Sequence, residues 1–230
     1  MPRDIPSQDY NAGHRRRLRD RFLKTGPEQV ADYELLELVL FQSRPRGDVK
    51  PLARMLLDRF GSFSEIVSAP AEDLMKLRGV GESTATALKA IRAAAIRLMQ
   101  EQVRERAVVS SWDQLIAYCR AAMGFSKREQ FRVLFLDKKN RIIADEILQE
   151  GTVDHTPVYP REVVARALDL GATALILVHN HPSGDTTPSK ADIEMTNQIR
   201  QAASVLGIVL HDHIVVGRSA HTSFKARGLL

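Results

Sequence analysis

The residues with the clearest chemical potential lie between positions 179 and 192, where the chain reads HNHPSGDTTPSKAD. His179 and His181 follow a short, wholly apolar stretch, residues 174–178 (ALILV). Alternate side chains of an extended backbone point to the same side, so both imidazoles can reach one metal ion. With Asp192 they would supply two nitrogens and a carboxylate, which leaves one tetrahedral position of Zn²⁺ open, as in catalytic zinc sites. The spacing therefore predicts a zinc site.

The same residues have a plainer explanation. Ser189 and Asp192 have the spacing of a capping box, in which the serine caps a helix and the acid reaches back to the serine amide. Two histidines one residue apart also occur by chance at protein surfaces. From the residues alone, both interpretations stay open.

The elements expected around these residues form a mixed α/β domain over residues 108–230. Residues 131–137 (FRVLFLD) and 141–148 (RIIADEIL) have the pattern of a β-hairpin. Residues 174–178 resemble a strand that is covered on both faces of a sheet. A helix is expected over residues 189–206. Helices packed against a central sheet are the architecture that this order favours.

The first half reads as successive helices, so we expect an all-α domain over residues 1–100 and a linker over residues 101–107. Residues 1–107 hold 19 Lys and Arg against 15 Asp and Glu, whereas residues 108–230 hold 14 against 13. Five arginines lie close together near the N-terminus: Arg15, Arg16, Arg17, Arg19 and Arg21. Such a cluster can neutralise phosphates, or it can be the solvated face of a helix.

A glycine-containing turn between two predicted helices gives a second candidate site, residues 77–85 (LRGVGESTA). Gly79 and Gly81 permit a tight turn with exposed backbone amides, and a helix begins at Ser83 or Thr84. A helix N-terminus at that point can bind phosphate without reading bases. The segment resembles the helix-hairpin-helix motif of non-specific DNA-binding proteins. We therefore expect contact with the DNA backbone there, although the glycines could serve only to join two packed helices.

The composition and the absence of certain sequence features exclude some classes of protein. The chain is 44% hydrophobic and 27% charged, with a single cysteine, Cys119. No apolar run is long enough to span a membrane, and no signal peptide is evident, so we expect a cytoplasmic protein without a membrane partner. A zinc deaminase is excluded because it needs an H-x-E motif and a P-C-x-x-C pair.

The spacing H-x-H, seven residues, S, two residues, D is similar to the JAMM motif of the MPN/JAB metalloproteases. The flanking residues 159–163 (YPREV), 174–185 (ALILVHNHPSGD) and 210–217 (LHDHIVVG), together with residues 13–41, resemble the bacterial RadC family (UPF0758). The chain is identified as a member of that family over nearly its whole length. The resemblance implies a helix-hairpin-helix N-terminal domain followed by a JAB/MPN-type domain with a cytidine-deaminase-like fold.

The resemblance also implies roles for residues. His179, His181 and Asp192 would bind zinc, one ion per chain, and Ser189 would hydrogen-bond the developing oxyanion. A JAMM peptidase needs a glutamate as general base from an upstream strand, and Glu129 is at the expected place. A frame shifted by one residue would put Gln130 there. The alternatives for the base are Glu146, Glu150 and Glu162.

Three further residues, His211, Asp212 and His213, would either orient the metal ligands or form a satisfied polar strand edge. The implied activity is that of a zinc metallopeptidase or isopeptidase with an unknown protein or peptide substrate and a DNA-contacting N-terminal domain. The family label links it to DNA repair. The alternatives are a zinc-dependent nuclease and a DNA-associated adaptor without significant catalysis.

Overall fold

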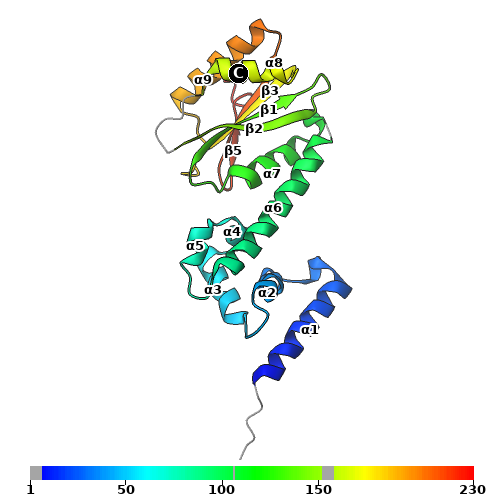
Figure 1. Cartoon of the computed structure of the whole chain (residues 1–230). Coiled ribbons are helices and arrows are strands. Elements are labelled where there is room, and N and C mark those ends of the chain that lie inside the picture. The colour runs from blue at the N-terminus through cyan, green and yellow to red at the C-terminus, as the bar shows by residue number, and fades with distance from the viewer. Residues whose placement is uncertain (1–6, 106, 152–157) are drawn as a thin grey trace, which may run out of the picture. The chain divides into compact units, whose positions relative to one another are not determined.

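The computed structural model of the chain describes residues 7–105, 107–151 and 158–230 (Figure 1). It divides into two compact units between residues 95 and 96. The first unit is helical. The second unit is of the mixed α/β kind, with helices packed on a sheet. The division falls inside helix α6, Glu82–Arg104, which continues beyond residue 100 into the region expected to be a linker. Val103 explains the extra length, since it is 1% exposed and belongs to the core of the second unit.

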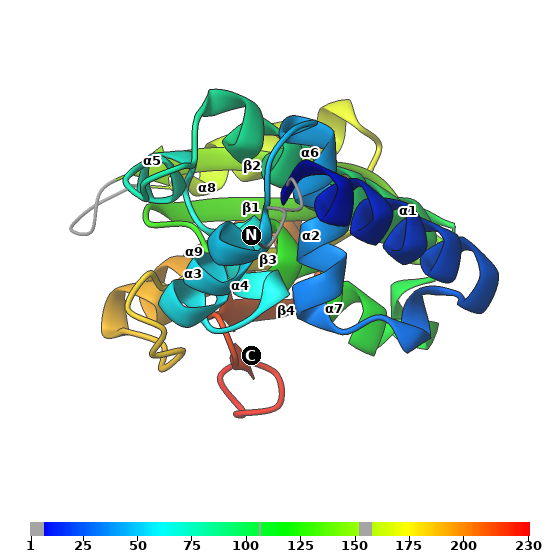
Figure 2. The ribbon, with the colours of Figure 1, turned by 90° about the horizontal axis from the view of Figure 1, so that it is seen from below.

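Short helices build the first unit around one apolar core. Only α1 and α6 are longer than 12 residues, so most of the helices depend on tertiary packing for stability. Helix α1 packs against α2 (Figures 1 and 2). The core includes Leu36, Leu40, Leu56, Ile66 and Leu88, all with no exposed surface. The elements before α6 are α1 Ser7–Thr25, η1 Pro27–Gln29, α2 Asp32–Ser43, α3 Lys50–Phe60, α4 Phe63–Ser68 and α5 Ala71–Met75.

The second unit is built on a five-stranded sheet with the order β2-β1-β3-β4-β5. Figure 2 shows the labels β2, β1, β3 and β4 following one another in this order. Strands β3 and β4 are parallel, and the other neighbouring pairs are antiparallel. The strands are β1 Glu129–Leu136, β2 Ile142–Gly151, β3 Ala174–Asn180, β4 Val209–Val216 and β5 His221–Ser223.

Helices cover both faces of this sheet (Figure 1). Helix α7, Trp112–Met123, and the end of α6 pack on one face, after the short helix η2, Val108–Ser110. Helices α8, Pro160–Asp169, and α9, Lys190–Val205, pack on the other. All seven residues of β3 are buried, as its apolar sequence predicts for a strand covered on both sides.

Alternation along β3 decides which residues face which helices. Ile176 and Val178 belong to the core under α7, whereas Leu175 and Leu177 belong to the core under α8 and α9. By the same period of two, His179 faces the α8 and α9 side and Asn180 faces the α7 side. Across the described residues, no helix is both long and apolar enough to cross a membrane.

Candidate metal centre

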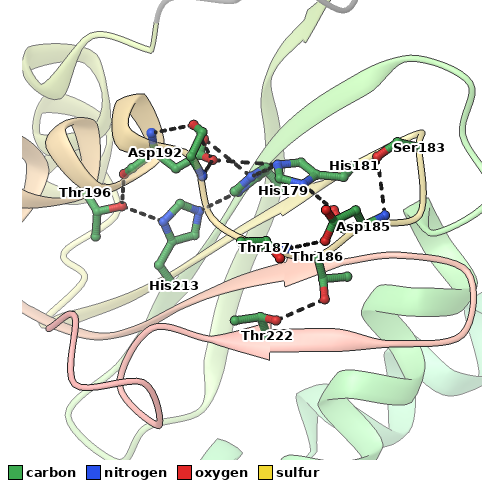
Figure 3. A network of polar contacts seen from close by, with 11 residues as sticks. His179, His181, Ser183, Asp185, Thr186, Thr187, Asp192, Thr196, His213 and Thr222 are labelled. Atoms are coloured by element: carbon green, nitrogen blue, oxygen red, sulfur yellow. Dashed lines mark hydrogen bonds and ion pairs between the residues drawn. The ribbon is translucent and has the colours of Figure 1, made fainter.

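Four side chains from separate segments converge at one end of the sheet. His179 lies near the end of β3, His181 directly follows that strand, Asp192 lies in the first turn of α9, and Glu129 is the first residue of β1. Each offers a ligand atom within 4.8 Å of the others. Figure 3 shows His179, His181 and Asp192 pointing toward one another. The three predicted ligands and the predicted base thus lie together.

The distances within this cluster suit a small cation. The Nε2 atoms of His179 and His181 are 2.9 Å apart. Asp192 places Oδ1 at 3.5 Å from Nε2 of His179 and Oδ2 at 3.6 Å from Nε2 of His181. Tetrahedral zinc with bonds of about 2.0–2.1 Å separates its donor atoms by about 3.3–3.4 Å. The two imidazole rings would have to move apart only slightly for an ion to bind to both of them.

The hydrogen-bond partner of His181 shows where its free lone pair points. Nδ1 of His181 lies 2.6 Å from the backbone oxygen of Asp185. A carbonyl only accepts, so Nδ1 carries the proton and Nε2 of the neutral ring presents a lone pair to the cluster. That lone pair faces Nε2 of His179 and the Asp192 carboxylate, and only a cation or a proton between them relieves the repulsion. Two imidazole nitrogens and carboxylate oxygens form a donor set that zinc favours.

Asp192 forms the capping box and also lies in the candidate metal cluster, so the two interpretations of the sequence are compatible. Its Oδ2 accepts hydrogen bonds from the amide and the hydroxyl of Ser189, both at 2.7 Å, and its own amide donates to Ser189 Oγ at 3.1 Å. This is a complete capping box at the start of α9. The same carboxylate meets His179 through Oδ1. The hydroxyl proton of Ser189 is committed to Asp192, so Ser189 must rotate before it can donate to an oxyanion.

The electrostatics keep Asp192 ionised. Burial raises its pKa, but the neighbouring imidazoles of His179 and His181 and the Ser189 hydroxyl outweigh burial and hold the pKa far below its ordinary value. In the ion-free chain, the contact with Asp192 raises the pKa of His181, and burial lowers it less. Asp192 therefore places a negative charge beside the two imidazoles, which a cation would balance.

Asn180, between the two histidines, sets the position of Glu129. Its side chain is fully buried on the opposite face of the sheet. Its Oδ1 accepts from the amide of Gln130 at 2.8 Å, and its Nδ2 donates to the carbonyl of Arg128 at 3.1 Å. These two bonds bracket residue 129 and fix the first residue of β1. Glu129 lies in the cluster in consequence, and Gln130, the next residue of the strand, faces the other side of the sheet by alternation.

The other glutamates considered for the base lie elsewhere. Glu146 on β2 is held by Arg166, with Oε1 at 2.6 Å from Nη2 and Oε2 at 2.9 Å from Nε. Glu150 and Glu162 are exposed. None of the three belongs to the four-residue cluster. Among the described residues, Glu129 is the glutamate that the fold brings to the predicted ligands.

Backbone contacts order the loop between His181 and α9. The amide of His181 donates to the carbonyl of Val216 at 3.0 Å. The hydroxyls of Thr186 and Thr222 are 2.9 Å apart and buried. Figure 3 shows the two side chains facing each other. A Cβ on Gly217 would lie 2.8 Å from the carbonyl oxygen of Gly184, so the close approach of the two backbones requires glycine.

Strand β4 supplies a residue whose role the sequence left open. His213 has no exposed surface, and its Nε2 lies 2.8 Å from Nδ1 of His179. Burial, followed by the nearby His179, lowers the pKa of His213 well below its ordinary value. Asp212 points to the opposite face and accepts hydrogen bonds from the amide of Lys225 and the hydroxyl of Ser223, whereas His211 contacts Asn140. Of these three neighbours in β4, only His213 therefore touches a predicted ligand.

Thr196 and Asn180 were not predicted as parts of the site. Thr196 lies one turn after Asp192 on α9, a spacing that places both on one helix face. Asn180 lies inside the H-x-H motif, where alternation alone indicates that it faces away from the histidines. These spacings were available in the sequence, but their partners on β4 and β1 depend on strand order.

The predicted hairpin lies in the first unit. Gly79 has φ +93°, a conformation that favours glycine, and its carbonyl accepts from Arg44 Nη1 at 3.2 Å. Gly81 and Ser83 are exposed beside the start of α6. Thr84 is different: it is 3% exposed, and its hydroxyl contacts that of Ser43 at 3.3 Å. The side chain of Thr84 therefore packs inside the unit, and the expected contact of this segment with the DNA backbone stays a prediction.

Several arginines of the N-terminal cluster are used within the unit. Arg15 donates to the carbonyls of Pro45 and Gly47 at 2.9 and 2.6 Å. Arg21 forms an ion pair with Glu34. The guanidinium of Arg19 lies 5.6 Å from the centre of the Phe41 ring. Arg16, Arg17, Arg19 and Arg21 are nevertheless all exposed. The basic cluster is thus partly structural.

Comparisons with known proteins agree across both units. The RadC-like JAB domain family matches residues 109–229, and the UPF0758 N-terminal family matches residues 11–86. The chain is 57% identical over 221 residues to a UPF0758 protein of Ruegeria pomeroyi, covering 96% of this chain and 99% of the relative. It is 61% identical over 213 residues to a UPF0758 protein of Rhodobacter capsulatus, covering 93% and 100%. With a JAB-type sheet that carries a His, Asp and Glu cluster able to hold a metal ion, the chain belongs to the RadC-like JAB domain family.

Proposed function

We propose that this protein is a zinc-dependent hydrolase of the JAMM type that cleaves peptide or isopeptide bonds. The observation that carries the proposal is the convergence of two imidazole Nε2 atoms, the Asp192 carboxylate and Glu129 at one point. His179, His181 and Asp192 would hold the ion. Bound zinc supplies Lewis acidity, which polarises a carbonyl and makes water a stronger acid.

The chain's own residues would then handle the proton. Glu129 is half-buried at the rim of the cluster, within reach of water and substrate. Its carboxylate would accept a proton from the attacking water and return it to the leaving nitrogen, as a general base and then a general acid. Asn180 holds the backbone on both sides of Glu129, so the carboxylate is positioned before substrate binds.

Ser189 would act after its hydroxyl rotates about the Cβ–Oγ bond, which redirects the proton and leaves Oγ in place. Its hydroxyl proton now points to Oδ2 of Asp192. When Asp192 engages an ion, that oxygen becomes a poorer acceptor, which favours donation from Ser189 to a developing oxyanion instead. The helix cap survives because the Asp192 amide can still donate to Ser189 Oγ.

The number of carboxylates favours a peptidase over a nuclease. Two-metal nucleases use more acidic ligands, because two ions 3.5–4 Å apart must be bridged and balanced. In the described part of the chain, the cluster includes only two acids, Asp192 and Glu129. Contact of the first unit with DNA, and a role in DNA repair, are separate proposals that this site does not require.

Elemental analysis of the purified protein tests the metal first. We expect about one zinc per chain in the wild type and none in His179→Ala or Asp192→Ala. His211→Ala is the matched control, because His211 lies on β4 but contacts Asn140. A wild type that stays empty after zinc is added would refute the proposal.

Glu129→Gln tests the reaction. It keeps the shape of the side chain and should bind zinc normally, while hydrolysis falls by a factor of about 100 or more because the base is lost. Peptide, isopeptide and DNA substrates should be screened side by side with the wild type. Cleavage of DNA alone would favour the nuclease, and equal rates in Glu129→Gln would exclude Glu129 as the base.

A further inference from the structure

A chain of hydrogen bonds runs from the candidate ligand His179 into the core between β4 and α9. Nδ1 of His179 lies 2.8 Å from Nε2 of His213. Nδ1 of His213 lies 2.6 Å from Oγ1 of Thr196, which lies 2.5 Å from the backbone oxygen of Asp192 (Figure 3). This series of hydrogen bonds thus begins at the candidate ligand His179 and ends at the backbone of the candidate ligand Asp192.

The direction of each bond follows from the last acceptor. A backbone carbonyl cannot donate, so the single hydroxyl proton of Thr196 goes to Asp192. Oγ1 of Thr196 must then accept from His213, which places the His213 proton on Nδ1. Nε2 of the neutral His213 ring is left as an acceptor, so His179 donates from Nδ1. The Nε2 atom of His179 is consequently free of a proton and faces the other ligands.

A positively charged His213 would reverse the bond to His179, but its surroundings oppose that charge. The His213 ring stacks on Phe224 at 4.5 Å between centroids and meets the edge of Phe131 at 5.8 Å. The two ring nitrogens contact a hydroxyl and an imidazole, and among the described residues no carboxylate is hydrogen-bonded to the ring. An ion buried without a partner of opposite charge is strongly disfavoured.

We propose that Thr196 and His213 are positioning residues that hold His179 as the Nδ1–H tautomer and so keep its Nε2 lone pair available to a metal ion. The inference rests on the proposed zinc site, because only there does the Nε2 lone pair have a use. Metal-binding histidines commonly donate their second ring nitrogen to a carboxylate or a carbonyl. Here a neutral imidazole takes that place, and its own tautomer has to be fixed by a hydroxyl.

The variant Thr196→Val tests the proposal because valine keeps the shape of threonine and removes the hydroxyl. Without the acceptor at Nδ1, His213 can turn to its Nε2–H tautomer and donate to His179. His179 then carries its proton on Nε2, where it competes with the ion. We expect zinc affinity to fall about 10- to 100-fold, the usual effect of losing an outer partner of a ligand. Thr196→Ser retains a hydroxyl and should restore most of the affinity.

The tautomers can be read directly from ¹⁵N shifts of the histidine rings in long-range ¹H–¹⁵N correlation spectra. In the wild type we expect His213 with a proton on Nδ1 and a bare Nε2, before and after zinc is added. Zinc affinity is measured in parallel by competition with a chromogenic chelator. Ile199→Val is the control, because Ile199 lies buried on the same helix and its truncation destabilises the same core without touching the hydrogen-bond chain.

The outcomes separate this inference from the zinc site itself. A wild type that binds no zinc refutes the proposed function, yet the ring shifts of His213 still show whether Thr196 sets its tautomer. A wild-type His213 with its proton on Nε2 overturns the inference. So does a folded Thr196→Val protein whose zinc affinity stays within twofold of the Ile199→Val control.

Discussion

The substitution Asn180→Ala tests how the sheet positions the candidate base. Asn180 is fully buried, and its two hydrogen bonds join the end of β3 to the backbone on each side of Glu129. Each bond contributes about 0.5–1.5 kcal/mol net, and the space left by the amide adds a smaller cavity cost. We expect the free energy of unfolding of the second unit to fall by about 2–4 kcal/mol.

Tryptophan fluorescence during urea unfolding measures this change. Trp112 is the only tryptophan in the chain and lies at the start of α7, in the second unit. The control is Asn197→Ala on α9, where the amide oxygen accepts one bond from Arg200 at 3.0 Å near the surface. That control should change stability by no more than about 0.5 kcal/mol.

The same variant also tests whether Asn180 supports the candidate base without supporting the candidate metal ligands. Asn180→Ala should still bind about one zinc per chain, because His179, His181 and Asp192 keep their own supports. Hydrolysis should fall, because Glu129 loses its fixed backbone. Two results would refute the reasoning: a stability loss as small as that of Asn197→Ala, or a loss of zinc as complete as that of His179→Ala.

Three more predictions concern other parts of the chain. Arg132→Met should lower the free energy of unfolding of the second unit by about 3–5 kcal/mol in the same assay, because it leaves the buried carboxylate of Asp145 without its ion-pair partner. Adding Asp145→Leu should recover most of this loss. An equal loss in the single and the double variant would contradict the prediction. Cys119 is fully buried, and burial raises the pKa of its thiol to about 12. A thiol reagent at pH 8 should therefore label Cys119 only after unfolding. Rapid labelling of the native protein would argue against the placement of Cys119 in the core. If the hairpin binds DNA, Ser83→Glu should weaken binding to a labelled duplex several-fold at low salt, whereas Ser110→Glu, the same change at an exposed site outside the hairpin, should not. Equal anisotropy curves for the two variants would contradict hairpin contact.

The pattern of helices and strands was sufficient to predict a helical first half and a mixed α/β second half. The spacing of the motif was sufficient to predict the residues that meet at the cluster. Alternation in β3 predicted that His179 and His181 share a side, and the helix start at Ser189 placed Asp192 within reach. The pairing of β1 with β2 was expected as a hairpin, but the rest of the strand order was not predictable, because the position of β3 between β1 and β4 depends on long-range pairing. The roles of Asn180 and His213 follow from that order.

Boundaries depended on tertiary contacts in the same way. Strand β5 has three residues, too few for a periodic pattern, yet it covers one side of β4. A linker was expected over residues 101–107, but helix α6 continues to Arg104 because Val103 is buried in the second core. Near the hairpin, the side chain of Thr84 packs inside the first unit, because a polar residue near a helix start can face a neighbouring helix as well as solvent.

The capping box at the start of α9 depends on the same carboxylate, that of Asp192, which would bind the proposed metal ion. A ligand that binds only the folded state stabilises it, by about 2.7 kcal/mol at a concentration one hundred times its dissociation constant. At Asp192 that stabilisation would act on the first turn of α9, so exchange of its amide hydrogens with solvent should slow when the ion binds. The amides of Ser189 and Asp192 would then report occupancy of the site without any knowledge of its substrate.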